Sequence, residues 1–340
     1  MKTRRGNLKI LFGLGVAAGV TAARLCSARS YDFRGRTVFI TGGSRGLGLL
    51  MAREFALRGA KVAIAARDTQ TLARAEAELR KVTDQVLAID SDITVREDAE
   101  TAVDRIRQSF GPVDVLVNNA GTISVGPFEV MTIDDYRDSI ETHFWGPYFA
   151  TMAVLPGMRR RRQGRIVNIS SIGGKISVPH LLPYSVGKFA LTGFSEGLRA
   201  ALLKEHIFVT TVCPGLMRTG SPRNAFFKGD NEAEYAWFSV SDAMPVLSMS
   251  AERAARQIVN ACSRGDAELI LTAPAKAAVR FAGVFPGITS DLLAIANEVL
   301  PSDRGAGTEA KAGKESFSSA SPSWATTLNE RVAKQNNQVA

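Results

Sequence analysis

Three side chains in one short stretch could together move a proton. Tyr184 and Lys188 are four residues apart, which places both on one face of a helix, and Ser171 precedes the tyrosine by thirteen residues. A phenol titrates near ~10, and bringing its pKa to about 7 requires roughly 4 kcal/mol of preferential stabilisation of the phenolate. A nearby ammonium and a second positive charge could supply this stabilisation of the phenolate in a site that excludes most of the water. The same spacing also occurs by chance in helices that are purely structural.

Two elements would have to position these residues. The β-branched run 166–169 predicts a buried strand, so Ser170 and Ser171 would follow its carboxyl end, where open α/β sheets bind ligands. A helix that opens after Pro183 would carry the tyrosine and the lysine. Its apolar spacing is that of a packed helix face, with Val186, Ala190, Leu191, Phe194 and Leu198.

From Arg36 onward, apolar runs alternate with segments of helical periodicity. We expect strands at 37–41, 61–66, 85–90, 113–118, 165–170, 207–212 and 267–272. We expect helices at 47–57, 69–81, 96–109 and 134–158, then the Tyr184 helix, then 251–262. Such alternation predicts an α/β fold, with a doubly wound seven-stranded parallel sheet and helices on both faces.

A glycine-rich turn, TGGSRGLG at 41–48, separates the first strand from the first helix. Its glycines allow a sharp turn and the close approach of a diphosphate, which would rest on the helix N-terminus. The turn follows a strand and opens a helix, which is the context that dinucleotide binding requires. Arg67 follows the second strand, where an acidic residue would favour NAD, and Arg45 lies in the turn itself. Two guanidiniums at one place favour a 2′-phosphate, so we expect NADP(H).

Two further turns follow the third and fourth strands. Asp92 could accept a hydrogen bond from an adenine amino group, and NNAG at 118–121 could brace the sheet beside a ribose. Each could also be only a turn, because Asp and Asn are common there.

These motifs, with Pro214-Gly215 and Thr219, together resemble the short-chain dehydrogenase/reductase family over roughly residues 34–275. The resemblance implies a single-domain Rossmann fold, hydride transfer to or from nicotinamide C4, and a homodimer or homotetramer built on the long helices. It implies that Tyr184 is the general acid/base, that Ser171 holds the substrate oxygen, and that Lys188 lowers the tyrosine pKa and holds the nicotinamide ribose. The implied cofactor contacts are Thr41, Gly42, Ser44, Arg45, Gly46, Leu47, Gly48, Arg67, Asp92, Ile93, Asn119, Ala120, Gly121, Tyr184, Lys188, Pro214, Gly215 and Thr219.

The chain departs from the family pattern at one catalytic position. The family has an Asn three residues before a Gly in the long helix, and the matching segment here is HFWG, which begins with His143. A ring nitrogen of His143 could replace the Asn in a proton relay, or the backbone carbonyl could keep that role. The imidazole could equally be a satisfied core side chain.

The net charge of +9 is concentrated at the N-terminus, because residues 1–36 carry seven of these charges. The apolar run 10–23 is fourteen residues long, short of the ~20 that cross a bilayer. We expect residues 1–30 to anchor the protein to a membrane surface with its catalytic domain in the cytoplasm; twin-arginine export is the alternative. We expect no nucleic-acid partner and no metal site. Three cysteines far apart imply no disulfide framework.

The remaining segments surround the expected catalytic domain, 31–275. Residues 220–249 are rich in aromatic side chains and methionine, which predicts a lid over an apolar ketone, aldehyde or alcohol. The apolar extension 276–301 could lie on a membrane or on a second subunit. For 302–340 the composition predicts disorder, with a weak helix near 326–334.

The expected function is therefore an NADP(H)-dependent oxidoreductase of the short-chain type that acts on a hydrophobic carbonyl or alcohol. The alternative is a non-catalytic NADP-binding scaffold or redox sensor, in which His143 marks a degraded site. Epimerase or dehydratase chemistry on nucleotide sugars would need a separate substrate domain, and the segment after Thr219 is too short for one.

Overall fold

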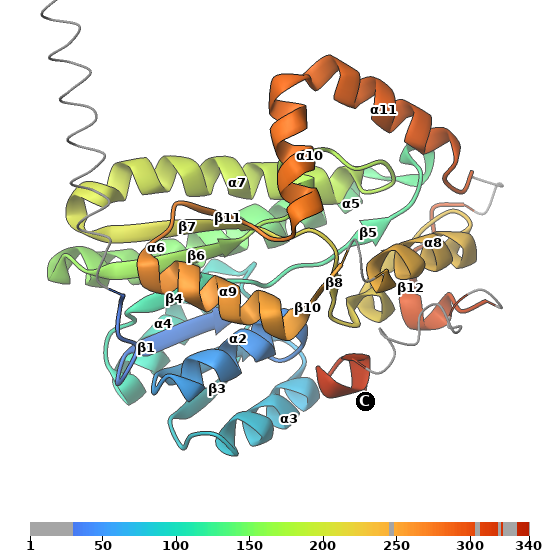
Figure 1. Ribbon diagram of the computed structural model, residues 1–340. Coiled ribbons are helices and arrows are strands. Elements are labelled where there is room, and N and C mark those ends of the chain that lie inside the picture. Colours follow the sequence, from blue (N-terminus) through green and yellow to red (C-terminus); the bar gives the residue numbers. More distant parts are fainter. Residues whose placement is uncertain (1–29, 245–247, 303–306, 319–320, 322–331, 340) are drawn as a thin grey trace, which may run out of the picture.

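Seven parallel strands form the centre of the fold (Figure 1). The computed structural model describes residues 30–244, 248–302, 307–318, 321 and 332–339. The strands are β1 (Thr37–Thr41), β2 (Lys61–Ala66), β3 (Val86–Asp90), β4 (Val115–Asn118), β6 (Gly164–Ile169), β7 (Ile207–Cys213) and β11 (Glu268–Ile270). Their order in the sheet is β11-β7-β6-β4-β1-β2-β3, which confirms the predicted doubly wound α/β fold.

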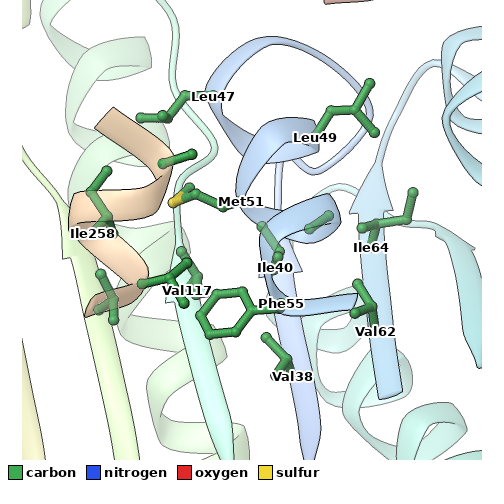
Figure 2. Close-up of a cluster of buried hydrophobic side chains, with 14 of the residues drawn as sticks. Val38, Ile40, Leu47, Leu49, Met51, Phe55, Val62, Ile64, Val117 and Ile258 are labelled. Atoms are coloured by element: carbon green, nitrogen blue, oxygen red, sulfur yellow. The ribbon is translucent and has the colours of Figure 1, made fainter. Parts of the chain in front are cut away.

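Helices cover both faces of this sheet. On one face lie α2 (Gly46–Leu57), α3 (Thr69–Arg80) and α9 (Ala251–Arg264), and on the other lie α4 (Arg96–Phe110), α6 (Gly146–Arg161) and α7 (Leu182–Leu202). Figure 2 shows the first of the two cores, where Met51 and Phe55 of α2 pack between the strands and Ile258 of α9. The two residues are four apart, so one stripe of α2 is buried.

The strand order reverses between β1 and β4. From β1 the chain moves outward through β2 to β3, and from β4 it moves in the opposite direction to β6, β7 and β11. In an open α/β sheet, the loops that follow the two central strands diverge at such a point and leave a crevice between them. The glycine turn after Thr41 and the NNAG segment after β4 both lie at this place.

The single long helix expected at 134–158 is instead three consecutive pieces. They are α5 (Ile133–Ile140), a π-helical turn (Glu141–Trp145) and α6. The prediction was wrong because Pro147, the second residue of α6, has no N–H to donate to the carbonyl four residues earlier, that of His143. The wider turn places His143 at the break, and π-turns of this kind are frequent at functional sites.

The expected lid region is built from short elements. It contains η5 (Ser221–Asn224), β9 (Phe226–Phe227) and α8 (Asn231–Ala243). Strand β9 lies between β5 (Ser124–Val125) and β12 (Lys311–Ala312) in a small three-stranded sheet, and β8 (Met217–Arg218) pairs with β10 (Met249–Ser250).

The described parts of 302–340 are ordered, so the prediction of disorder does not hold for them. Residues 307–318 contain β12 and η6 (Gly313–Glu315), and residues 332–339 pack on the core of the molecule. Their composition misled the prediction because they are held by hydrogen bonds to other segments rather than by an apolar core of their own. The expected helix near 326–334 falls largely outside the described residues.

Helices α10 (Ala273–Val284) and α11 (Pro286–Glu298) form the apolar extension and stand away from the sheet (Figure 1). None of the side chains of α11 is buried. Within the described ranges, no helix has both the length and the apolar character needed to span a bilayer. The predicted anchor, residues 1–29, lies outside those ranges. Cys213 and Cys262 are free and buried.

Candidate active site

Ser171 and Tyr184 come together at the carboxyl end of β6. After the strand ends at Ile169, Ser171 caps a short 3-10 turn and its Oγ accepts a hydrogen bond from the Gly173 N–H at 3.0 Å. A Cβ on Gly173 would lie 3.1 Å from Cε1 of Tyr184, so the glycine lets the tyrosine ring pack against this turn. Tyr184, in the first turn of α7, lies beside Ser171, since the same Cβ would be 3.5 Å from Oγ of Ser171.

Lys188 lies one helical turn after Tyr184 and is almost fully buried, with 4% of its surface exposed. Its Nζ donates to the carbonyl of Ile169 at 2.9 Å and lies 5.6 Å from the centroid of the Tyr184 ring. Ser170 reinforces the junction because its Oγ donates to the Lys188 carbonyl at 3.1 Å. Ser171, Tyr184 and Lys188 therefore form the single constellation that their spacing predicts.

Burial controls the charge of both titratable groups. It raises the pKa of Tyr184 to about 12, and the nearby Ser171 hydroxyl lowers that pKa only in part. Burial also lowers the pKa of Lys188 to about 7, and the neighbouring Cys213 offsets little of this effect. We expected Lys188 to bring the tyrosine pKa down toward neutrality. In the structure desolvation opposes this effect, because it disfavours the phenolate and the ammonium alike; the second positive charge expected at the site, that of a nicotinamide ring, would come with a bound cofactor.

His143 lies directly behind the tyrosine. The imidazole is fully buried and its ring meets that of Tyr184 edge to face, with 5.3 Å between the centroids. Its Nδ1 lies 3.2 Å from Oγ of Ser139, whose hydroxyl donates to the carbonyl of Pro183 at 2.6 Å. Burial and the charge of Lys188 hold the pKa of His143 well below its usual value, so the ring is neutral near pH 7. Ser139 was not predicted, because a serine in a polar helix turn carries no distinctive signal.

The other side of Tyr184 is apolar. The ring packs against a cluster of buried side chains from β5, the N-cap of α7 and the segment from Ala225 through α8, namely Val125, Leu181, Ala225, Phe227, Tyr235 and Phe238. A cavity of about 300 Å³ lies nearby, lined by Phe128, Val178, Leu182 and Leu293 among others, but not by the three candidate catalytic side chains.

A buried polar pair fastens α8 to the loop before α7. His180 Nδ1 lies 2.7 Å from a carboxylate oxygen of Glu234, and the other oxygen accepts a hydrogen bond from Trp237 at 2.6 Å. Both members of the pair are buried. Sequence reasoning missed it, because the two residues are far apart in the chain and neither belongs to a recognisable motif.

The glycine turn presents its backbone without side chains in the way. Gly42 and Gly46 have positive φ angles of 64° and 56°. A Cβ on Gly42 would lie 2.8 Å from the Cα of Ala120, and one on Gly48 would overlap the carbonyl oxygen of Gly42. Leu47 is buried under the turn. The N-terminus of α2 therefore packs directly on the turn, which fits a bound diphosphate.

The NNAG segment braces this turn from the neighbouring strand. The backbone amides of Asn119 and Ala120 donate to Oγ1 of Thr41 at 3.0 and 3.1 Å. The side-chain amide of Asn119 donates to the carbonyls of Thr41 and Gly42. Gly121 lies beside the catalytic residues, since a Cβ there would be 3.2 Å from Nε2 of His143 and 3.7 Å from Nζ of Lys188.

The two predicted phosphate-binding arginines are exposed at this edge of the sheet. Arg67 forms an ion pair with Asp92 at 3.4 Å, so these two residues contact each other across neighbouring strand ends. Burial raises the pKa of Asp92, but hydrogen bonds from Thr94 and Arg67 outweigh it and leave that pKa below its usual value. Arg45 donates to the side chain of Asn224 at 3.1 Å.

The remaining predicted cofactor residues lie around the same crevice. Ile93 is buried, and its side chain packs 3.1 Å from the position that a Cβ on Gly146 would take. The carbonyl of Pro214 accepts the N–H of Ile172 at 2.7 Å, which joins the segment after β7 to the turn that carries Ser171. Gly215 follows Pro214 in that segment and the buried Thr219 lies further along it, while Ser44 is buried within the glycine turn.

Comparisons with known proteins find relatives over most of this chain. The family model described as short chain dehydrogenase matches residues 36–227. Dehydrogenase/reductase SDR family member 7B of Mus musculus is 33% identical over 78% of this chain and 82% of its own length. The 11-beta-hydroxysteroid dehydrogenase A of Sesamum indicum is 34% identical over 72% of this chain and 70% of its own.

A solved structure carries the same fold with a cofactor. The L-sorbose reductase of Gluconobacter frateurii, crystallised with NADPH and L-sorbose, aligns with a TM-score of 0.64 and 28% identity. The alignment covers 71% of this chain and 97% of that one.

Proposed function

This chain belongs to the short chain dehydrogenase family, and we propose that it is an NADP(H)-dependent oxidoreductase that interconverts an apolar ketone or aldehyde and its alcohol. The observation that carries the proposal is the junction of β6 and α7. There the side chains of Ser171 and Tyr184 both lie against Gly173, and the tyrosine ring borders an apolar cluster. A carbonyl oxygen can accept a hydrogen bond from both hydroxyls, while its apolar substituents contact the cluster.

The protonation state of Tyr184 suits carbonyl reduction. Its raised pKa keeps the phenol protonated at neutral pH, which is the form that donates a proton to a carbonyl oxygen. Bound NADPH supplies the hydride for the carbonyl carbon. Ser171 donates a hydrogen bond to the same oxygen, and this bond strengthens as negative charge develops there. Lys188 holds the strand end in place through Ile169 and faces the side of the site where Gly121 lies.

Arg45 and Arg67 support the preference for the phosphorylated dinucleotide. Arg45 lies in the glycine turn as the N-cap of α2, and Arg67 directly follows β2, where a bound dinucleotide places its adenosine ribose; both are exposed. A guanidinium binds phosphate through parallel hydrogen bonds, so a 2′-phosphate would bind here more readily than a bare hydroxyl. The sorbose reductase with the same fold was crystallised with NADPH, which agrees with this assignment.

The substrate class follows from the lid. Phe227, Phe238 and Leu181 belong to the apolar cluster against which Tyr184 packs. The cavity is lined by Phe128, Val178, Leu182 and Leu293, together with the polar Glu129, Ser177, His180 and Asn297. A sugar such as the L-sorbose of the solved relative would leave its hydroxyl groups unpaired against the apolar cluster. The name of the sesame relative contains a hydroxysteroid, an apolar alcohol, and that chemistry suits this lid better.

Replacing Tyr184 by phenylalanine tests the proposal. We expect the wild-type protein to oxidise NADPH in the presence of at least one member of a panel of apolar ketones and aldehydes. Tyr184→Phe keeps the ring but removes the donated proton, so kcat should fall by about 10² to 10⁴-fold. Tyr148→Phe is the matched control, because that ring, on α6, packs with Phe144 of the π-helical turn and Phe194 of α7. NADPH binding without turnover on any carbonyl would favour the scaffold or redox sensor instead.

We also propose that the protein is a homo-oligomer assembled through α6 and α7. Trp145, Val186 and Phe189 are exposed apolar side chains at or on these helices. Adjacent exposed apolar side chains of this size commonly mark an interface. Light scattering on the purified protein should give the mass of a dimer or tetramer, and a monomeric mass at micromolar concentration would contradict this assembly.

A further inference from the structure

The C-terminal segment, residues 332–339, lies beside α3 and the glycine turn (Figure 1). It begins with one helical turn at 332–335, and Ala333 and Asn336 are almost completely buried. A short polar segment gains little from apolar burial, so its position depends on the hydrogen bonds that it makes. Those bonds lead to three elements that surround the predicted dinucleotide site.

The first element is the N-terminus of α2. The N–H of Gly46 donates to the carbonyl of Asn336 at 2.8 Å. Gln338 lies across the same glycine, with its Nε2 only 2.6 Å from the position that a Cβ would take. The amides of a first helical turn have no partner within the helix, and in a dinucleotide fold they face the diphosphate. The segment therefore places a carbonyl oxygen where a phosphate oxygen is expected.

The second element is α3, which flanks the expected adenosine end. The side-chain amide of Asn337 donates to the carbonyls of Ser44 and Thr71 at 2.8 and 2.9 Å. Its Oδ1 accepts a hydrogen bond from Nε of Arg74 at 2.8 Å. One neutral side chain thus links the glycine turn to α3 and engages a guanidinium at the edge where Arg45 and Arg67 also lie.

The third element is the segment that follows β7. Asn336 donates through Nδ2 to the carbonyl of Thr219 at 3.3 Å, and Asn224 donates to Oε1 of Gln338 at 2.7 Å. A Cβ on Gly220 would lie 2.5 Å from the Cα of Ala333, so the backbones of the two segments are in direct contact at this glycine. The C-terminal segment therefore spans the crevice from α3 to the side expected to hold the nicotinamide.

We propose that residues 332–339 are an intramolecular competitor of the dinucleotide and must leave the glycine turn before NADP(H) can bind. The inference rests on the cofactor binding proposed above but not on the carbonyl chemistry. The proposal predicts how much the binding weakens. The apparent dissociation constant for NADP(H) equals the intrinsic constant divided by the fraction of molecules in which the segment has left the glycine turn. A segment closed in nine molecules of ten would weaken NADPH binding about tenfold.

Neighbouring amide side chains of the segment provide a matched pair for the test. Asn337→Ala in the full chain removes the hydrogen bonds to Ser44, Thr71 and Arg74, whereas Gln335→Ala shortens an exposed side chain. Titration with NADPH, followed by nicotinamide fluorescence, should show about tenfold tighter binding for Asn337→Ala and wild-type binding for Gln335→Ala. A chain ending at residue 331 should bind at least as tightly as Asn337→Ala. Unchanged or weaker binding in Asn337→Ala overturns the proposal.

Hydrogen exchange separates competition from the opposite arrangement, a cover over the bound cofactor. If the segment competes, saturating NADPH must speed amide exchange at 332–339 in the full chain, because the segment is released. Slower exchange at these residues would show that the segment closes over NADPH and would overturn the proposal. Tighter binding by Asn337→Ala, with no turnover on any carbonyl, would support this inference while contradicting the proposed reductase.

Discussion

Tyr184 and Lys188 lie on the same face of α7. Burial favours the neutral form of each side chain, because it raises the pKa of the phenol and lowers the pKa of the amine. The phenol keeps its proton up to a pKa of about 12, and the amine loses its own near 7. A protonated tyrosine is ready to act as an acid in reduction. As a base in alcohol oxidation it would first have to ionise, which requires added positive charge in the site.

The pH at which the Lys188 amine titrates can be measured directly. Its ¹³Cε resonance in the cofactor-free protein should titrate near pH 7 instead of the ordinary 10.5, and Lys188→Met assigns the signal. Between these two values the unfolded chain binds the proton and the folded chain does not. The contribution of Lys188 to the free energy of unfolding therefore rises with pH across this window. A titration near pH 10 would show that the ammonium is stabilised in the fold and would contradict this description.

Among elements, α7 depends on a glycine between its two functional residues. A Cβ on Gly187 would lie 2.5 Å from Oγ of Ser139 and 2.9 Å from Nδ1 of His143. Only glycine lets α7 pack this closely on α5 and the π-turn. The same contact holds the His143 imidazole against the Tyr184 ring, so the close packing of α7 positions both side chains in the candidate site.

Two glycine substitutions in α7 should therefore change stability in opposite directions. Gly187→Ala forces the helices apart and should lower the free energy of unfolding by about 1–3 kcal/mol, with a loss of turnover. Gly193→Ala is the control, because nothing lies within 4 Å of its Cβ position. It should raise stability by up to about 1 kcal/mol, since alanine is the better helix former. Denaturant unfolding measures both, and equal effects of the two changes would contradict the role given to Gly187.

The sequence predicts much of this arrangement and misses particular parts. The strands, the glycine turn and the junction of Ser171, Tyr184 and Lys188 follow from local periodicity and spacing. These features depend on residues that are close together in the chain, so the sequence pattern alone predicts them. The break at His143 depends on one proline in an otherwise helical pattern. The order at 332–339 depends on hydrogen bonds to residues more than a hundred positions away, such as Ser44 and Thr219. The pKa directions depend on burial, which the one-dimensional pattern does not quantify.

At the scale of the whole molecule, α10 and α11 present an apolar surface beside the substrate side. Phe285, Ile288, Leu292 and Ile295 are all about half exposed or more, and Leu293 lines the cavity near Tyr184. We propose that this surface lies on a membrane, together with the basic and apolar residues 1–29, and that the apolar substrate enters from there. The catalytic domain would then lie on the cytoplasmic side, as expected from the N-terminal sequence.

Vesicle binding tests this orientation. A chain lacking residues 1–29 should float with phosphatidylcholine vesicles containing anionic lipid. Leu292→Asp should lower the bound fraction several-fold, because it places a charge in the apolar face of α11. Ser290→Asp adds the same charge to an exposed position on another face of the helix and should change binding little. Equal loss in both variants, or no binding by the parent chain, would contradict a membrane-facing α11.

The most direct test of the central claim is to follow the hydride itself. NADPH deuterated at both C4 positions should give, with an apolar ketone, an alcohol that carries one deuterium on its carbinol carbon. Mass spectrometry of the product should show this label for the wild-type protein and for Tyr148→Phe, and only a trace for Tyr184→Phe. Oxidation of NADPH without a deuterated alcohol, or full labelling by Tyr184→Phe, would contradict a reductase that uses Tyr184 as its acid.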